Sequence, residues 1–218
     1  MKKVLIICIS AALTLGNLAS ASAHAGFDTR GVTPVKGKSS VVLLRIGHGC
    51  TAPDGVTKVA THAVSAVIPA ALLAAPASAA MQIPGWNAVV VPSTEKDAAG
   101  SPVSNTITWT AKSDLFDVNP VGFAEFGIRG AWASAGTHFV DTTQLCRLAT
   151  KTKVAGKVIV VTDPKTRAKI KSWVAPTTKT TYQELKISWS DHVSSASTYN
   201  ADKTTETGPA PTVTIAAA

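Results

Sequence analysis

The feature that most constrains the fold is a series of short apolar or alternating segments separated by Gly, Pro, Ser and Thr. Residues 39–46 read SSVVLLRI and residues 105–110 read NTITWT, both rich in the β-branched and aromatic residues that favour strands. Further segments of this kind span 61–68, 88–91, 121–129, 157–161, 184–189 and 211–215. Many short strands with frequent turns are typical of a β-sandwich or barrel, so the sequence predicts an all-β chain.

One segment favours a helix. Residues 70–80 are rich in Ala, which has the highest helix propensity, but they contain Pro76. A helix and a loop both remain open for this segment.

The first 23 residues have the three parts of a secretory signal peptide: two lysines, an apolar run over 4–15, and the small residues Ala21 and Ala23 before a cleavage point. The apolar run is shorter than the roughly 20 residues that a membrane-spanning helix needs. We therefore expect cleavage between Ala23 and His24, with cleavage two residues to either side as the alternative. The mature chain, 24–218, would be periplasmic or secreted and would carry no membrane anchor.

Positive charge is concentrated in one part of the chain. The formal net charge is +8, and eight of the 19 basic residues of the mature chain cluster in an insertion near 147–172. Such a cluster can bind nucleic acid or an acidic surface, or it can be a solvated hairpin. We favour the hairpin and expect no nucleic-acid partner, because few aromatic residues are interleaved. A polar, Thr/Ser-rich segment follows near 177–208.

Two cysteines remain after signal cleavage, Cys50 and Cys146. Cysteines in an oxidising compartment usually pair, so we expect a disulfide between them. By the chain-entropy model, closing a loop of about 95 residues stabilises the fold by roughly 4–5 kcal/mol. The alternative is a two-thiolate metal site, for which His48 is the only nearby ligand.

Cleavage before His24 would create a metal-binding group. The α-amino nitrogen and the imidazole Nδ1 of one residue can close a chelate ring, which suits the tetragonal nitrogen and oxygen surroundings that Cu(II) prefers. The amino group gives up its proton to the metal. His48 is a second candidate ligand, because the glycines on either side of it permit close backbone approach. A plain turn histidine is the alternative reading of His48.

A set of landmarks follows in a fixed order along the chain. These are Ala23-His24-Ala25, Gly47-His48-Gly49-Cys50, Pro84-Gly85-Trp86, Ile107-Thr108-Trp109, Glu125-Phe126-Gly127-Ile128-Arg129 and Gln144-Leu145-Cys146. Their order over 24–146 resembles the YcnI-like family of exported bacterial copper-binding proteins, in its His-Gly-Cys subgroup. The segment 208–211, Gly-Pro-Ala-Pro, also looks like the end of that family's domain.

The resemblance implies a single-domain, immunoglobulin-like β-sandwich with a Cu(II) site, a mono-histidine brace on His24. Family members add a glutamate and a tryptophan. This chain has His48 in the region of the glutamate, so His48 is expected to take its place. For the tryptophan, Trp173 is the best match and Trp189 the alternative. The implied function is copper delivery or sequestration without catalysis, together with a copper-trafficking protein as partner.

Two other functions compete with copper handling. Histidine braces also occur in copper-dependent oxidative enzymes, where a second histidine such as His48 or His138 would be needed. The third reading is a metal-free extracellular interaction module built on the sandwich and its Thr-rich segment.

Overall fold

The computed structural model describes residues 24–73 and 79–218, so the expected signal peptide lies outside the described residues. The described chain is built almost wholly of β-strands. A single turn of 3-10 helix, η1 (Asp114–Phe116), interrupts them, and the described residues contain no α-helix. Accordingly, no helix in the described ranges is long and apolar enough to cross a bilayer.

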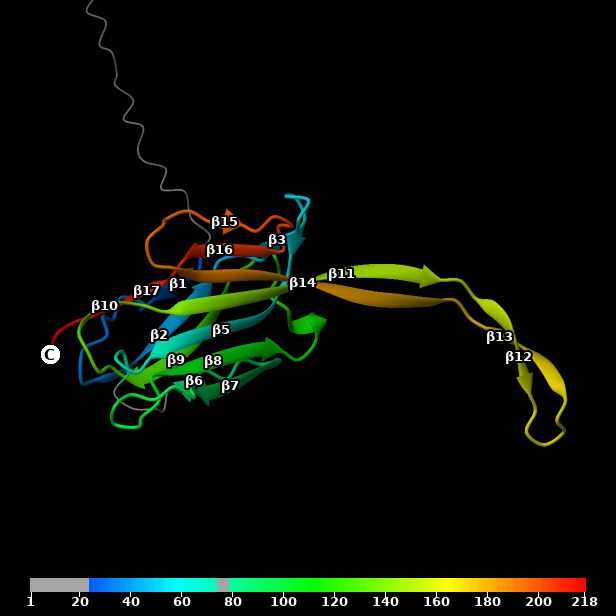
Figure 1. Cartoon of the computed structure of the whole chain (residues 1–218), viewed down its shortest axis with the longest axis horizontal. Helices are drawn as coiled ribbons and strands as arrows, with labels where there is room; N and C mark the ends of the chain where they lie inside the picture. The colour runs from blue at the N-terminus through cyan, green and yellow to red at the C-terminus, as the bar shows by residue number, and fades with distance from the viewer. Residues whose placement is uncertain (1–23, 74–78) are drawn as a thin grey trace, which may run out of the picture.

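The larger sheet has seven strands in the order β15-β16-β14-β11-β5-β8-β7 (Figure 1). Their bounds are Thr198–Tyr199, Thr205–Pro209, Thr177–Asp191, Asp141–Val154, Thr61–Pro69, Ser104–Ala111 and Trp86–Pro92. All neighbours are antiparallel except β14 and β16, which run parallel.

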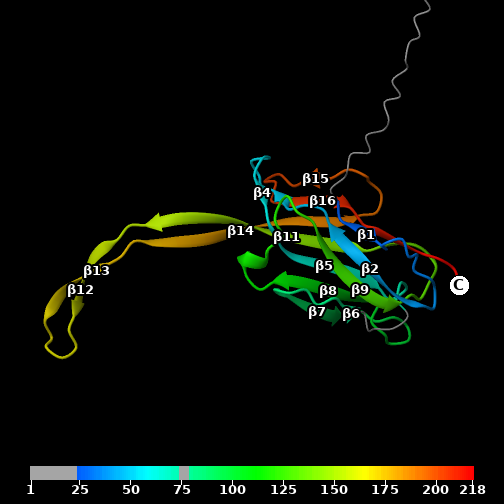
Figure 2. The ribbon, with the colours of Figure 1, turned by 180° about the vertical axis from the view of Figure 1, so that it is seen from behind.

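The smaller sheet has four strands in the order β1-β2-β9-β6, with β2 and β9 in front in Figure 2. Their bounds are Gly26–Asp28, Ser39–Ile46, Ala124–Ala131 and Ala79–Ala80. Three two-stranded pairs complete the fold: β3 (Cys50–Thr51) with β4 (Lys58–Val59), β10 (Gly136–Phe139) with β17 (Thr212–Ile215), and β12 (Lys157–Thr162) with β13 (Lys169–Val174).

The two sheets pack face to face around one core. Strand β8 shows why: every second residue, from Asn105 to Ala111, is buried, as the period of two along a strand requires. From the opposite sheet, Phe126 packs with its ring centroid 5.3 Å from that of Trp109. Each large apolar side chain buried in this way contributes about 1.5–3 kcal/mol. The prediction of an all-β sandwich is confirmed.

A long arm leaves one end of the sandwich (Figures 1 and 2). Strand β11 pairs with β5 only as far as Cys146, and from Arg147 onward it pairs with β14 alone, ending at Val154 opposite Thr177. The hairpin of β12 and β13 continues beyond this ribbon. The basic segment is therefore a hairpin, as expected.

The structure decides two points that the sequence left less defined. Within 70–80 the described residues hold no helix: 70–72 form a turn, Leu73 bridges to Trp132, and Ala79–Ala80 is β6, while 74–78 lie outside the described residues. The Thr/Ser-rich segment near 177–208 begins with β14, a 15-residue strand inside the larger sheet. Its inner half alternates, because Leu185, Ile187 and Trp189 face the core.

Candidate functional site

The register of β1 and β2 places His24 and the His48 loop at the same end of this strand pair. Gly26, the first residue of β1, pairs with Arg45 in an antiparallel ladder. His24 lies two residues before β1, and His48 follows β2, which ends at Ile46. Both candidate ligands therefore belong to segments at one corner of the sandwich, this end of the β1–β2 pair.

The tryptophan at this corner is Trp189. Its ring centroid lies 5.2 Å from that of His24, with an angle of 60° between the ring planes. Trp189 is almost fully buried, whereas Trp173 lies on β13 in the arm and is 63% exposed. The preferred match of Trp173 to the site is therefore replaced by Trp189, since β14 returns antiparallel to β11 and carries Trp189 back opposite Thr142.

Gln144 connects Trp189 to the His48 loop. Its Oε1 accepts a hydrogen bond of 3.3 Å from Trp189 Nε1. Its Nε2 donates to the backbone oxygen of His48 and to Thr61 Oγ1, each at 2.7 Å. Because both amide hydrogens and the amide oxygen are used, this buried glutamine fixes the indole and the loop relative to each other.

The His48 loop is held in two further ways. A Cβ on Gly49 would lie 2.0 Å from the Val59 oxygen, so only glycine permits the loop to approach β4 this closely. The expected disulfide is present: Cys50 is bonded to Cys146 of β11, which ties the loop to the larger sheet. This excludes the alternative in which the two thiolates bind a metal.

The donor atoms at this corner suit a metal that prefers nitrogen. The Nδ1 of His48 donates a hydrogen bond to the Gly49 oxygen, which orients the ring and makes Nε2 the ring nitrogen that could bind a metal. No group of three or more His, Cys, Asp or Glu side chains gathers around a metal-sized space within the described ranges. A site here would therefore use the two nitrogens of His24, with His48 as the further donor that the sequence analysis expects.

His24 is also open to solvent. It lies at a shallow cavity of about 430 Å³ that is formed by 24–27 and 209–212, the end of β16 and the start of β17. A small ligand or a partner can thus approach His24 from this side, while Trp189 closes the other side.

Strand β1 is anchored by a network of ion pairs that the sequence analysis did not identify. Arg45 donates to Asp28 at 2.6 Å and to Glu125 at 2.7 Å, and Arg30 also bonds to Glu125. The hydrogen bond from Arg45 holds the pKa of Glu125 below its usual value. The three strands β1, β2 and β9 are joined in this way close to His24. The only sequence signal was that Glu125 belongs to one of the landmarks.

The other histidines have different roles. His62 pairs with Asp117 at 2.9 Å, and His192 stacks on Phe139 and bonds to Asp141 at 2.7 Å. His138 on β10 lies 3.4 Å from Ser134 Oγ. We therefore assign none of these three to the corner formed by His24 and His48.

Comparisons with known proteins give a likeness of fold and nothing more specific. No family model matches the chain, and no curated protein matches it. A solved structure, of an uncharacterized protein from Nocardia farcinica described as having an immunoglobulin-like fold, matches with 22% identity and a TM-score of 0.49. The match covers 89% of this chain and 99% of that chain.

Proposed function

We propose that this chain is an exported protein that binds one Cu(II) ion at His24 for delivery or sequestration. The observation that carries the proposal is the packing of His24 against buried Trp189, which Gln144 links to the His48 loop. The disulfide supports export, because such bonds persist mainly in oxidising compartments.

The chemistry follows from the donors. After cleavage between Ala23 and His24, the α-amino nitrogen and Nδ1 of His24 chelate the ion, and His48 Nε2 is the candidate third ligand. Trp189 limits the approach of solvent from the core side, and Gln144 keeps the indole in place. The open cavity at 209–212 leaves a path for exchange with a copper-trafficking partner. This arrangement suits holding and releasing the ion, so we propose no catalysis.

The test uses the mature protein purified from its secreted form, with its N-terminus determined by mass spectrometry. Cu(II) is titrated by calorimetry, and EPR reports the number of nitrogen ligands. We expect His24→Ala, and a variant with Met-Gly added before His24, each to lose more affinity than the ~10–100-fold that loss of a supporting hydrogen bond costs. His48→Ala should lower the nitrogen count by one.

His138→Ala is the matched control, since it removes an imidazole elsewhere in the sandwich. Its affinity and spectrum should equal those of the unmodified protein. If the extended N-terminus binds Cu(II) as tightly as the free one, the proposal fails.

A further inference from the structure

The arm has a composition unlike that of the sandwich. We define the arm as residues 147–184, its shaft as 147–154 with 177–184, and its tip as 155–176. The arm holds nine Lys or Arg residues and two acidic ones, so its net charge of +7 accounts for all but one of the chain's net +8. The rest of the mature chain is close to neutral, and the charge is concentrated on one projection.

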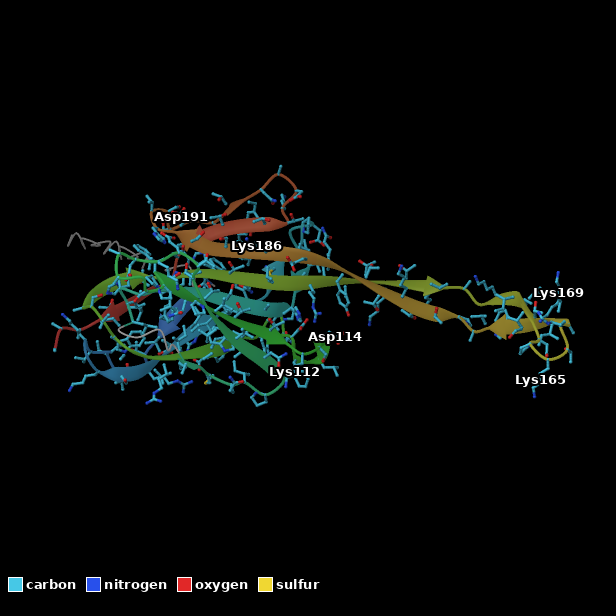
Figure 3. The ribbon with its side chains drawn as sticks, turned by 60° about the horizontal axis from the view of Figure 1, so that its bottom comes forward. Lys112, Asp114, Lys165, Lys169, Lys186 and Asp191 are labelled. Atoms are coloured by element: carbon cyan, nitrogen blue, oxygen red, sulfur yellow. A yellow bond between two sulfur atoms is a disulfide. The ribbon has the colours of Figure 1, made fainter. Side chains whose placement is uncertain are left out.

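The root of the arm is braced against the sandwich. Arg147 lies 5.1 Å from the ring centroid of Tyr182 and donates to Asp117 at 3.1 Å. The Tyr182 hydroxyl lies 3.4 Å from Asp114 of η1, which stands where the arm emerges (Figure 3). The arm therefore leaves the sandwich in a fixed direction.

The shaft and the tip differ in character. In the outer shaft, Thr and Lys face each other across the ribbon, as in the pairs Lys151 with Thr180 and Thr152 with Lys179. These polar side chains are solvated and expose no apolar surface that would need a partner. The shaft has eight residue pairs and thus a length of about 26 Å, so it carries the tip well clear of the sandwich.

The tip exposes apolar side chains on both faces, and the three most exposed of them lie on one face. Val158 pairs with Trp173 and Val160 with Lys171, and side chains that point to the same side of a strand recur every second residue. Val158, Val160 and Trp173 therefore share a face, and all three are more than half exposed. The same rule adds Lys169 to this face, and Lys165 and Lys169 lie at the far end of the arm (Figure 3). We call Val158, Val160, Lys169, Lys171 and Trp173 the tip face.

A two-stranded hairpin with uncovered Val and Trp is marginal in water by itself, so the tip face is suited to a partner. Its chemistry selects the partner. Trp sits at the boundary between headgroups and acyl chains, Val enters the apolar layer, and Lys reaches back to anionic headgroups along its own methylene stem. A second copy of the arm would be repelled by the same +7 charge. Nucleic acid would find one aromatic ring and no further stacking surface.

We propose that the tip face binds the surface of an anionic lipid bilayer and holds the sandwich above it. The interaction is peripheral and does not depend on copper, so it is independent of the function proposed for His24.

The test measures co-sedimentation of the mature protein with vesicles of phosphatidylcholine, with and without 30 mol% phosphatidylglycerol. We expect binding to the anionic vesicles that weakens as salt is raised, since salt screens the exposed lysines. Replacing Lys165, Lys169 and Lys171 by Gln should lower the partition coefficient on the order of 100-fold. The matched control replaces three exposed lysines of the sandwich, Lys36, Lys96 and Lys112, by Gln and should change it less than about 3-fold.

Fluorescence provides a second measurement that does not depend on a variant that folds. The other four tryptophans are at most 7% exposed, so a blue shift and protection from iodide on binding report Trp173. The Trp173→Phe variant should still bind and should lose the shift. The proposal is overturned if binding leaves Trp173 open to iodide, or if both triple-Gln variants bind equally. Capture by soluble polyglutamate without binding to anionic vesicles would assign the arm to an acidic protein instead.

Discussion

Gln144 is the residue whose replacement tests the architecture of the candidate site most directly. Leu fills a similar volume but makes none of the three hydrogen bonds. The Gln144→Leu variant leaves Thr61 Oγ1 and Trp189 Nε1 without this partner inside the core, and it leaves the His48 oxygen without one at the edge of the site. Thr61 and Trp189 are 0% and 1% exposed, so water does not replace the lost partner.

The expected cost follows from these burials. A buried polar group left unpaired costs about 1–3 kcal/mol, and two such groups are created here. The added apolar burial of Leu returns about 1 kcal/mol. The half-buried His48 oxygen adds little, because water can reach it. We therefore expect the free energy of unfolding to fall by about 1–5 kcal/mol, with about 3 kcal/mol as the central value.

The assay is urea unfolding at pH 7 with the disulfide intact, and the matched control is Thr142→Val. Thr142 lies on the same strand, is equally buried, and loses a single hydrogen bond, from its hydroxyl to the Val140 oxygen at 3.1 Å. Its cost should be near 1 kcal/mol. The indole N–H resonance of Trp189 should shift in the Leu variant and stay in place in the control. Equal costs for the two variants would refute the role of Gln144 as the link between Trp189 and the loop.

Two further predictions concern the support of His24. In Gly208→Ala the added Cβ would lie 2.5 Å from Cε3 and Cζ3 of Trp189. We expect this overpacking to lower the free energy of unfolding in urea by ~1–3 kcal/mol and to change the near-ultraviolet circular dichroism. The control Gly26→Ala, which has no atom within 4 Å of its Cβ, should change neither. Glu125 has a lowered pKa because Arg45 donates a hydrogen bond to it, so its contribution to stability is present above the ordinary glutamate pKa of about 4.3 and is lost as the pH falls through the lower folded value. In urea unfolding between pH 7 and 3, the free energy of unfolding should fall less steeply with decreasing pH for Glu125→Gln than for the unmodified protein. An equally steep fall in both proteins would show that the network does not anchor β1.

The sheets were predictable where one face of a strand is buried. Residues 39–46 became β2 with the predicted bounds, and 105–110 lie within β8, because burial on one side leaves an apolar pattern in the sequence. The outer half of β11 carries no such pattern. Both of its faces are solvated, its residues are Thr and Lys, and only the pairing with β14 makes it a strand.

The candidate site was predictable in its landmarks and not in its tryptophan. Proximity along the chain favoured Trp173, which is nearer to Cys146 in sequence. In a hairpin, however, position is set by register: Cys146 lies opposite Leu185, and Thr142 lies opposite Trp189. The residue that returns to the site thus depends on how long the arm is. Composition does not reveal that length, because the strand pairing that defines it is non-local.

The same two strands carry both proposed sites, and this sets their separation. On β14, Trp189 stands against His24 at one end, and Thr177 begins the strand where the shaft meets the tip. Twelve residues at about 3.3 Å each place the two about 40 Å apart. With the tip on a lipid surface, His24 and the cavity at 209–212 would remain in water, where a soluble copper donor or acceptor can reach them. A bilayer contact at this distance would fix where copper is exchanged but would not take part in binding the copper. The copper-binding proposal and the membrane-binding proposal are therefore tested by replacing different residues.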